Sequence, residues 1–568
     1  MVILGVCNAN DSGAALIIDG EIKSVANEER FTRKKLTRTF PINSIEYVLK
    51  SQGLTVSDVD YIGCGAWGGI DPETTFPKLI EDIFSQLENK EENTEKYILK
   101  RIQTSLKNDK NAKESLFKGL KEMGFDESII ITCDHHYSHA LTAYCCSPFK
   151  DAIVLTADGR GDFRSITLWE NNEDCQLKLI EFTTELASPG AFYGFITKHL
   201  GFTPDRHEGK ITGLAARGKI SKAYDILKKG YFYDEKKQLI QSKIGKNYIP
   251  FLSVEIKTLY SQLSKFSKED VAFAAQKILE EVLVAYLMKH IKNEKPNSIN
   301  LCLSGGCFAN VKLNHEIFSL PPVKNLYVFP HMGDGGNALG GALNVNAVKT
   351  KKMHAALPTV YLGPEYSDEE IFQELNRHSL EFQPIKDGEK GSIVSDKIAQ
   401  GKIIGWFQGR MEYGPRALGA RSILAEAKNP EVTKKLNDKL QRSDFMPFAP
   451  VTIDTWAEKC FVDWKPDHFL SRFMTTCYKC TPLLKEKCPA IVHLDDTARP
   501  QVVFREDNPD YYDTIRCYIE KTGNPAIINT SFNFHEEPIV MTPADAIKCF
   551  LNKNVSVLVI GNYLVEQS

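Results

Sequence analysis

Two histidines four residues apart give the sharpest chemical signal in the chain. His135 and His139 stand in the segment Asp134-His-His-Tyr-Ser-His-Ala, which leads into a helix-favouring run. Residues four apart share one face of a helix, so the two imidazoles can hold a single cation. Taken alone, the pair leaves a metal site and surface or capping histidines as equal alternatives.

Two acidic turns strengthen the metal interpretation. Asp158 comes after an apolar stretch, and Asp334 stands in His-Met-Gly-Asp-Gly-Gly. A metal that must hold phosphates or a carbonyl group needs hard oxygen ligands and open positions beside its imidazoles. The sequence therefore predicts a site of two histidines and two aspartates. Its mixed nitrogen and oxygen shell suits iron(II), manganese or zinc, and the sequence does not choose among them.

Three glycine-rich segments predict a phosphate site. They are residues 209–215, 304–310 and 333–336, the last running into a helix predicted over 337–344. Backbone amides of glycine turns can approach phosphates closely, and a helix N-terminus adds a favourable dipole. Each segment alone could be an ordinary tight turn. Together they favour a nucleotide whose phosphates contact Gly305, Gly306, Gly333 and Gly335.

A second cluster of chemistry lies near the C-terminus. Residues 409–422 set Arg410, Arg416 and Arg421 in a glycine-rich frame. Arginine binds phosphate and carboxylate groups with two parallel hydrogen bonds, so this segment predicts an oxyanion pocket, with a solvated basic face as the alternative. Arg499 and the run 529–533 add polar donors that could equally cap turns. The cysteines near residues 477–480 lack the second close pair of a zinc site, which favours reduced thiols.

The elements that must position these residues follow a repeated plan. Strands are predicted over 2–7, 14–18 and 21–26, with Asp19-Gly20 as a hairpin turn. Strands at 152–157, 165–169 and 177–182 repeat the pattern, which is typical of the duplicated actin and sugar-kinase superfold. Residues 85–124 predict exposed charged helices, either a solvated cover or an acceptor lid, and 267–295 predict a core helix.

Length and charge bound the class of protein. The 568 residues exceed one hydrophobic core, and we expect two α/β domains, residues 1–350 and 351–568, with a boundary near 345–360. The 70 lysines and arginines nearly balance 73 acidic residues, which argues against nucleic-acid or membrane-surface binding. With neither a signal peptide nor a long apolar run, we expect a cytoplasmic protein.

Several motifs in one order resemble the NodU-type O-carbamoyltransferases, which include antibiotic-tailoring and nodulation-factor enzymes. The motifs are residues 28–35 (EERFTRKK), the His135/His139 pair, 209–215, 413–419 and 529–533. The likeness runs from about residue 2 to 565. It implies an N-terminal duplicated actin-like (ribonuclease-H-like) domain and a C-terminal α/β domain of the threonylcarbamoyl-adenylate synthase type.

The resemblance also implies a reaction and its residues. Carbamoyl phosphate and ATP, with its Mg, would give carbamoyl-adenylate in the C-terminal domain, and the N-terminal domain would carbamoylate a hydroxyl of a small-molecule or sugar acceptor. The family's metal, with Fe(II) first, falls on His135, His139, Asp158 and Asp334, and its nucleotide contacts on Lys210, Gly213 and Asn310. Its activation site falls on Arg416, Arg421, Arg499 and Asn529, with Lys35 reaching toward the nucleotide.

Two positions depart from the family pattern. The first turn carries Asn10-Asp11 where relatives often have His-Asp, and an amide cannot act as a general base. Asp11, a metal-bound group or a more acidic acceptor could fill that role. A family arginine is replaced by Met446, and Arg442 is a candidate substitute for its basic contact.

Three other functions remain open on the sequence. An actin-fold kinase would release ADP and would not need the arginine segment. A tRNA threonylcarbamoyl transferase is disfavoured by the balanced charge. A catalytically inactive binding protein would explain Asn10. The acceptor and the oligomeric state stay open, a homodimer being one candidate.

Overall fold

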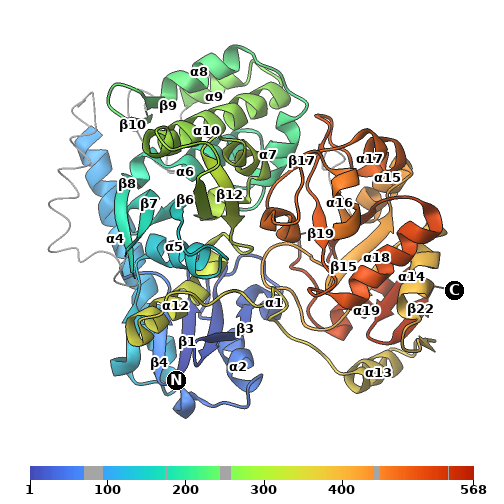
Figure 1. Ribbon diagram of the computed structural model, residues 1–568. Coiled ribbons are helices and arrows are strands. Elements are labelled where there is room, and N and C mark those ends of the chain that lie inside the picture. Colours follow the sequence, from blue (N-terminus) through green and yellow to red (C-terminus); the bar gives the residue numbers. More distant parts are fainter. Residues whose placement is uncertain (69–93, 173–175, 243–256, 441–447, 535, 568) are drawn as a thin grey trace. The chain divides into compact units, whose positions relative to one another are not determined.

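The computed structural model describes residues 1–68, 94–172, 176–242, 257–440, 448–534 and 536–567. The chain forms two compact units: residues 1–23 with 38–357, and residues 24–37 with 358–568 (Figure 1). The boundary in the second half of the chain thus falls at residues 357 and 358, but a short N-terminal segment also belongs to the second unit. The candidate contact at Arg442 and the Met446 departure lie outside the described residues.

The first unit contains two five-stranded sheets, apart from residues 24–27 at the end of one edge strand, which belong to the second unit. One has the order β3-β2-β1-β4-β5 and the other β12-β11-β6-β7-β8. In each, the first strand pairs antiparallel with the strand that follows it and parallel with a later strand, so the two sheets share one plan. The strands are β1 Val2–Cys7, β2 Gly13–Ile18, β3 Glu21–Asn27, β4 Tyr61–Cys64, β5 Ile130–Thr132, β6 Ile153–Gly161, β7 Arg164–Asn172, β8 Gln176–Thr184, β11 Ile299–Ser304 and β12 Val323–Val328.

These strands confirm the two predicted triplets to within a few residues. Asp19 and Gly20 both have positive φ, 51° and 85°, as a two-residue hairpin turn requires. The helices of this unit are α2 Ile42–Lys50, α4 Thr94–Glu122, α5 His135–Cys145, α6 Pro189–His199, α7 Glu208–Ala215, α8 Lys222–Gly230, α9 Lys257–Leu263, α10 Lys268–Ile291, α11 Val311–Phe318 and α12 Asn337–Thr350, with a hairpin of β9 Tyr231–Asp234 and β10 Leu239–Ser242. The predicted core helix corresponds to α10, capped by Ser267.

One prediction about local structure was wrong. Residues 209–215 do not form a glycine turn but lie in the helix α7. Neither Gly209 nor Gly213 takes the positive φ that would make glycine necessary. Burial of Ile211, Leu214 and Ala215 on one face gives the helix its packing energy, which outweighs the low helix propensity of glycine.

Close backbone packing fixes α12 against the first sheet and against α5. A Cβ atom on Gly5 of β1 would overlap the Ala338 carbonyl, and one on Gly63 of β4 would overlap the Gly341 carbonyl. On the other side of α12, a Cβ at Gly340 would overlap Ser138 of α5. Helix α5 in turn packs on β6, β7 and β11 of the second sheet. The N-terminal ends of α5 and α12 are thereby held close together.

The charged segment before residue 124 is helical where it is described. Helix α4 buries Leu116 and Leu120 in a cluster with Ile45 and Val48 of α2. The Asn8 side chain, in the turn after β1, donates a hydrogen bond to the Ala112 carbonyl at 2.8 Å. Helix α4 therefore covers the core of the unit. Whether it also acts as an acceptor lid stays a prediction.

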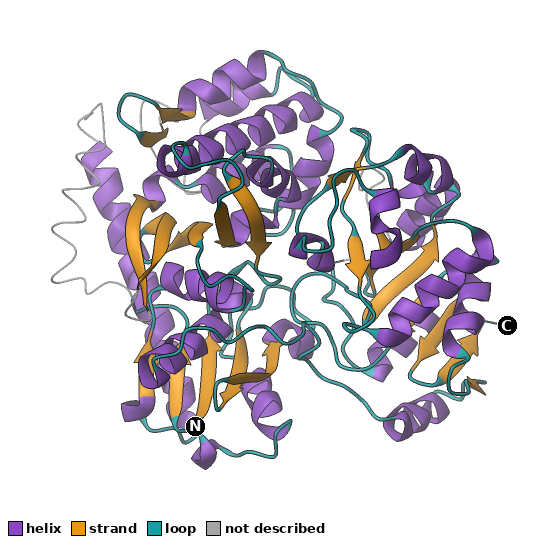
Figure 2. Ribbon diagram, in the orientation of Figure 1, coloured by secondary structure: helices purple, strands orange, loops and turns teal. Residues whose placement is uncertain are grey.

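The second unit is a mixed eight-stranded sheet with helices on both faces (Figure 2). Its strand order is β13-β22-β21-β14-β15-β20-β16-β19. Neighbouring residues point to opposite faces: Trp406 packs in a cluster with Tyr511 of α18, whereas Phe407 packs in another with Ile547 of α19. The elements are α1 Glu28–Thr32, α13 Asp368–Arg377, β13 Gln383–Pro384, α14 Lys390–Ala399, β14 Ile404–Phe407, β15 Arg421–Glu426, α15 Pro430–Lys439, β16 Ala449–Ile453, α16 Asp454–Cys460, β17 Tyr478–Lys479, α17 Pro482–Lys487, β18 Thr497–Ala498, β19 Gln501–Val503, α18 Pro509–Thr522, β20 Ile527–Ser531, α19 Pro543–Leu551, β21 Val557–Ile560 and β22 Tyr563–Glu566.

The cysteines agree with the prediction of reduced thiols. Those in the described ranges are free, and most are buried. Within the described ranges, we find no helix that combines the length and the apolar character needed to span a bilayer.

Candidate active site

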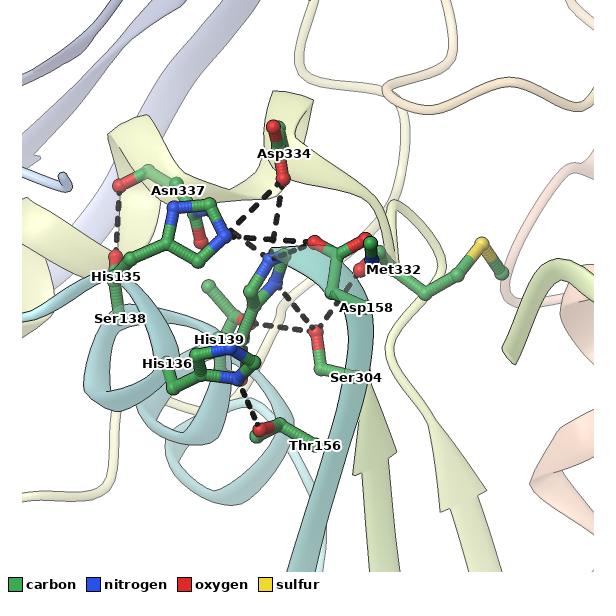
Figure 3. A network of polar contacts seen from close by, with 12 residues as sticks. His135, His136, Ser138, His139, Thr156, Asp158, Ser304, Met332, Asp334 and Asn337 are labelled. Atoms are coloured by element: carbon green, nitrogen blue, oxygen red, sulfur yellow. Dashed lines mark hydrogen bonds and ion pairs between the residues drawn. The ribbon is translucent and has the colours of Figure 1, made fainter. Parts of the chain in front are cut away.

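The four predicted metal ligands meet in the first unit. Their side chains converge from α5, β6 and the turn before α12, and one ligand atom from each lies within 4.8 Å of all the others (Figure 3). The Nε2 atom of His135 lies 3.4 Å from both Asp158 Oδ2 and Asp334 Oδ1. The Nε2 atom of His139 lies 3.1 Å from Asp158 and 3.4 Å from Asp334. The geometry therefore brings together all four residues that the sequence selected.

Local structure explains why these predicted ligands point toward one another. Asp134 caps α5 by accepting from Tyr137 N, and the His135 N–H donates to Asp162 at 2.7 Å, so the helix starts at the first ligand. Asp158 lies where the β6–β7 register shifts between Ala157 and Gly161. A bulge of this kind redirects side chains, which lets Asp158 face α5 from within a strand.

Hydrogen bonds assign the tautomer of His139. Ser304, the last residue of β11, donates its hydroxyl proton to the Met332 carbonyl at 3.2 Å. Its oxygen lies 3.3 Å from Nδ1 of His139 and is left to accept from that nitrogen. A neutral His139 with its proton on Nδ1 offers the Nε2 lone pair, which faces the two aspartates, to a metal ion. Without a metal, Nε2 carries a proton and donates to the Asp158 carboxylate at 3.1 Å. Such outer partners orient metal-binding histidines in general.

The electrostatics of the cluster call for positive charge at its centre. Burial by itself would lower the pKa of His135, but the carboxylates of Asp334 and Asp158 outweigh it and raise that pKa well above its ordinary value. Burial would raise the pKa of Asp334, yet the two imidazoles hold it well below its usual range. The neighbouring His136 has a strongly lowered pKa, from burial and from the other two histidines. Two buried carboxylates and two imidazoles whose Nε2 atoms face them suit a divalent metal ion, so the residues fit the cofactor that the sequence predicted.

The glycine turns predicted to hold phosphates border this cluster. Gly305 has φ of 106°, and a Cβ there would overlap the Ala157 carbonyl, so only glycine fits. A Cβ on Gly306 would lie 3.0 Å from Asp158 Oδ1. Gly333 and Gly335 flank Asp334 in the turn before α12. The predicted phosphate-binding backbone and the metal ligands thus share one region of the first unit.

The three remaining residues predicted to contact the nucleotide lie on helices that are joined by hydrogen bonds. Lys210 and Gly213 are on α7, and Asn310 caps α11 by accepting from the backbone of Lys312 and Leu313. Tyr193 joins these helices: its hydroxyl lies 3.1 Å from Thr212 of α7 and donates to Gln276 of α10 at 2.8 Å. Gln276 also accepts from the Asn310 amide at 2.8 Å.

Packing around His135 gives a first testable prediction. A Cβ on Gly161 would overlap the His135 ring, whereas one on Gly159, two residues away on the same strand, meets nothing within 4 Å. We expect Gly161→Ala to lower the free energy of unfolding by about 1–3 kcal/mol and to weaken metal binding, because the ring must move. Gly159→Ala is the matched control. Denaturant titration and metal analysis check this, and equal behaviour of the two variants would contradict it.

Glu208, the first residue of α7, gives a pH-dependent prediction. Burial raises the pKa of Glu208 from 4.5 to about 7. The folded protein therefore keeps this proton up to about pH 7, whereas the unfolded chain releases it near pH 4.5, so this group lowers stability as pH rises between those values. We expect Glu208→Gln to raise the free energy of unfolding at pH 8 by about 1–2 kcal/mol and to change it little at pH 4.5.

Chemical denaturation of both proteins at the two pH values measures this difference. Glu365→Gln, on an exposed side chain of the second unit, is the control. A Glu208→Gln protein that gains nothing at pH 8 would contradict the prediction.

In the second unit, a buried carboxylate organises the arginine segment. Glu412 Oε1 accepts from the backbone N–H groups of Leu418, Ala420 and Arg421 at 2.7, 3.3 and 3.2 Å. Gly419, with φ of 101°, packs so tightly on Tyr511 that a Cβ would overlap the ring. These contacts therefore fix the backbone conformation of the loop that carries Arg416.

The predicted activation residues divide into two groups. Asn529 lies against this loop, because its amide donates to the Ala417 carbonyl at 3.0 Å and to Gln501 at 2.7 Å. Arg416 is partly buried, and loss of solvent lowers its pKa to about 10. Arg421 differs: its guanidinium is fully buried and donates to the carbonyls of Gln408, Gly409, Ala420 and Pro364, while it stacks on Phe407. Arg421 thus stabilises the loop through hydrogen bonds to its backbone carbonyls.

Arg499 is two residues before Gln501, and Lys35 is exposed in the N-terminal segment of this unit. That segment contacts the arginine loop. Arg30 donates to the Gly414 carbonyl at 2.9 Å, and Phe31 packs in a cluster with Met411 and Ala417. The sequence predicted Gln501 as a polar donor but gave no role to Glu412 or Arg30. Arg30 acts on a residue far along the chain, and Glu412 acts on backbone N–H groups of its own loop, which no spacing rule indicates.

Comparison with known proteins places this arrangement in a family. Residues 2–343 match the model described as carbamoyltransferase N-terminus, and residues 395–567 match carbamoyltransferase C-terminus. The chain therefore belongs to the carbamoyltransferase family and is an enzyme of the transferase class.

Individual relatives match between about three quarters and all of this chain. Nodulation protein NolNO of Sinorhizobium fredii is 30% identical over 98% of this chain and 79% of its own length. An uncharacterized protein of Synechocystis, sll1178, is 31% identical over 100% of this chain and 97% of its own. The 3'-hydroxymethylcephem-O-carbamoyltransferase of Streptomyces clavuligerus is 25% identical over 76% of this chain and 79% of its own.

Proposed function

We propose that this protein is an ATP-dependent O-carbamoyltransferase that makes carbamoyl-adenylate and moves its carbamoyl group to a hydroxyl of a small-molecule or sugar acceptor. The convergence of His135, His139, Asp158 and Asp334 beside glycine turns carries the proposal, because it joins a metal site to phosphate-binding backbone. Membership of the carbamoyltransferase family supports a carbamoyl group as the one that is transferred.

The second unit, essentially residues 351–568, is proposed as the activation domain, of the threonylcarbamoyl-adenylate synthase type. Carbamoyl phosphate gives up its phosphoryl group to water, and the resulting carbamate oxygen attacks the α-phosphorus of Mg-bound ATP, releasing pyrophosphate. Arg416 and Arg499 neutralise the charge that develops on these phosphates, and Asn529 and Lys35 orient them. Arg421 holds the loop through its carbonyl contacts.

The first unit, essentially residues 1–350, is proposed as a duplicated actin-like transfer domain. The shared plan of its two sheets supports the duplication. The backbone of Gly305, Gly306, Gly333 and Gly335 would cradle the phosphate of the adenylate, with Lys210, Gly213 and Asn310 around the rest of the nucleotide. A divalent metal held by the four ligands, iron(II) first and manganese or zinc as alternatives, would act as a Lewis acid toward the carbamoyl carbonyl.

Product analysis tests the proposal. The protein, loaded with iron(II), is mixed with ATP and ¹⁴C-carbamoyl phosphate, and pyrophosphate, orthophosphate, AMP and ADP are quantified. We expect pyrophosphate, orthophosphate and AMP to form with carbamoyl phosphate and to be absent without it. Formation of ADP would indicate a kinase instead. Absence of any nucleotide product would indicate an inactive binding protein.

A further inference from the structure

A buried carboxylate and imidazole form a pair next to the metal cluster. Asp11 lies in the turn between β1 and β2 with φ of 64°, and His331 lies between β12 and α12. The Nε2 atom of His331 is 3.2 Å from Asp11 Oδ2, and the two side chains are only 6% and 9% exposed. Asp11 was a candidate base from the sequence, whereas no role was predicted for His331.

Packing places this pair beside the cluster without making it part of it. A Cβ on Gly335 would overlap both the His331 ring and the Asp11 carboxylate, so the pair lies against the residue that follows Asp334. A Cβ on Gly336 would also overlap the His331 carbonyl. Burial is the main cause of the raised pKa of the Cys7 thiol at the end of β1, and the charges of Asp334 and Asp11 are among the smaller contributions that raise it further. The carboxylates of Asp11 and Asp334 therefore lie at the same end of this strand.

The chemistry of the pair is that of an oriented base. A carboxylate that accepts from Nε2–H holds the imidazole in one tautomer, leaves the lone pair on Nδ1 and stabilises the imidazolium that forms when Nδ1 takes a proton. The neighbouring Asn10 has no such capacity: its Oδ1 accepts from Arg38 Nε at 3.3 Å. The first turn thus supplies a carboxylate, and the turn before α12 supplies the imidazole.

We propose that His331 is the general base of carbamoyl transfer and that Asp11 is its positioning residue. This rests on the proposed function. As the acceptor oxygen bonds to the carbamoyl carbon, its proton passes to Nδ1 of His331, and the bond from that carbon to the phosphoryl oxygen breaks, so that AMP leaves with the electron pair.

The test separates nucleophiles that need a base from one that does not. Wild type, His331→Gln, His331→Ala and Asp11→Asn are supplied with ATP, ¹⁴C-carbamoyl phosphate and iron(II). Water serves as the oxygen nucleophile, and AMP release is measured. Hydroxylamine serves as the nitrogen nucleophile, which attacks without a base, and hydroxyurea is measured. Pyrophosphate formation and bound metal are measured in parallel.

We expect AMP release by water to fall about 10²–10⁴-fold in the His331 variants, while hydroxyurea and pyrophosphate formation change by less than about 3-fold. Added imidazole should restore AMP release in His331→Ala at least about 10-fold. Asp11→Asn should also lose AMP release by water while it keeps hydroxyurea and pyrophosphate formation. His290→Gln is the matched control, because His290 is also paired with a carboxylate, Glu181 Oε2, at 2.8 Å.

Three results would overturn the assignment of His331: AMP release equal to that of wild type, parallel loss of AMP and hydroxyurea in a variant that still forms pyrophosphate, or loss of the metal from His331→Gln. Pyrophosphate formation in each variant reports that the protein is folded. If wild type forms no pyrophosphate, the proposed function itself fails and this inference fails with it.

Discussion

His139→Ala is expected to remove the bound metal and to lower carbamoyl transfer by about 10³-fold, while pyrophosphate formation stays within about 2-fold of wild type. His139 is fully buried, and its Nε2 faces both carboxylates at 3.1 and 3.4 Å. Its loss removes one of the four predicted ligands. The carboxylates of Asp158 and Asp334 then repel each other with only one imidazole to offset their charge. The arginine loop of the second unit is untouched, so activation should continue.

Metal analysis and separate assays of pyrophosphate and of carbamoyl transfer measure this. His136→Gln is the matched control: it lies on the same helix and is equally buried, but its Nδ1 bonds to Thr156 at 2.7 Å and it is not one of the four ligands. Retention of metal and transfer by His139→Ala would contradict the assigned site. Loss of pyrophosphate formation together with transfer would contradict the division of labour between the units.

The sequence predicted the four residues that cluster in the first unit because their signals are local. A spacing of four residues defines one face of α5, and a helix cap at Asp134 sets where that face begins. Asp158 was found as the residue after an apolar strand, although it lies within β6 at a register shift that no spacing rule anticipates. The prediction of a glycine turn at 209–215 was wrong, because glycine indicates a turn only where the backbone needs positive φ.

Residues that act through distant contacts could not be predicted in the same way. Asp11 was a candidate base from the sequence, but its pairing with His331 was not predicted, because the two are far apart along the chain and the packing of α12 on β1 and β4 brings their turns together. Arg421 and Arg416 are arginines of the same glycine-rich segment, so the same role was predicted for both. Burial instead directs the Arg421 guanidinium to backbone carbonyls. A contiguous domain division likewise could not assign residues 24–37 to the second unit.

Arg416→Ala is expected to lower pyrophosphate formation by about 10²–10³-fold, because one preorganised donor to developing charge contributes about 3–4 kcal/mol. Loss of solvent lowers the pKa of Arg416 only to about 10, so it stays charged at neutral pH. A partly buried cation in a loop fixed by Glu412 is pre-positioned for an anionic ligand. Metal content should not change, because the four ligands lie in the other unit.

Arg416→Lys separates charge from geometry. Lysine keeps the charge but cannot present two parallel N–H groups, so we expect an intermediate loss of about 10-fold, mainly in KM for carbamoyl phosphate or ATP. Arg377→Ala, whose side chain is 73% exposed on α13 of the same unit, is the control. Pyrophosphate formation by Arg416→Ala at the wild-type rate would remove this loop from the activation site. Equal loss in Arg416→Lys and Arg416→Ala would show that the paired geometry of the guanidinium, rather than its charge, is what the reaction requires.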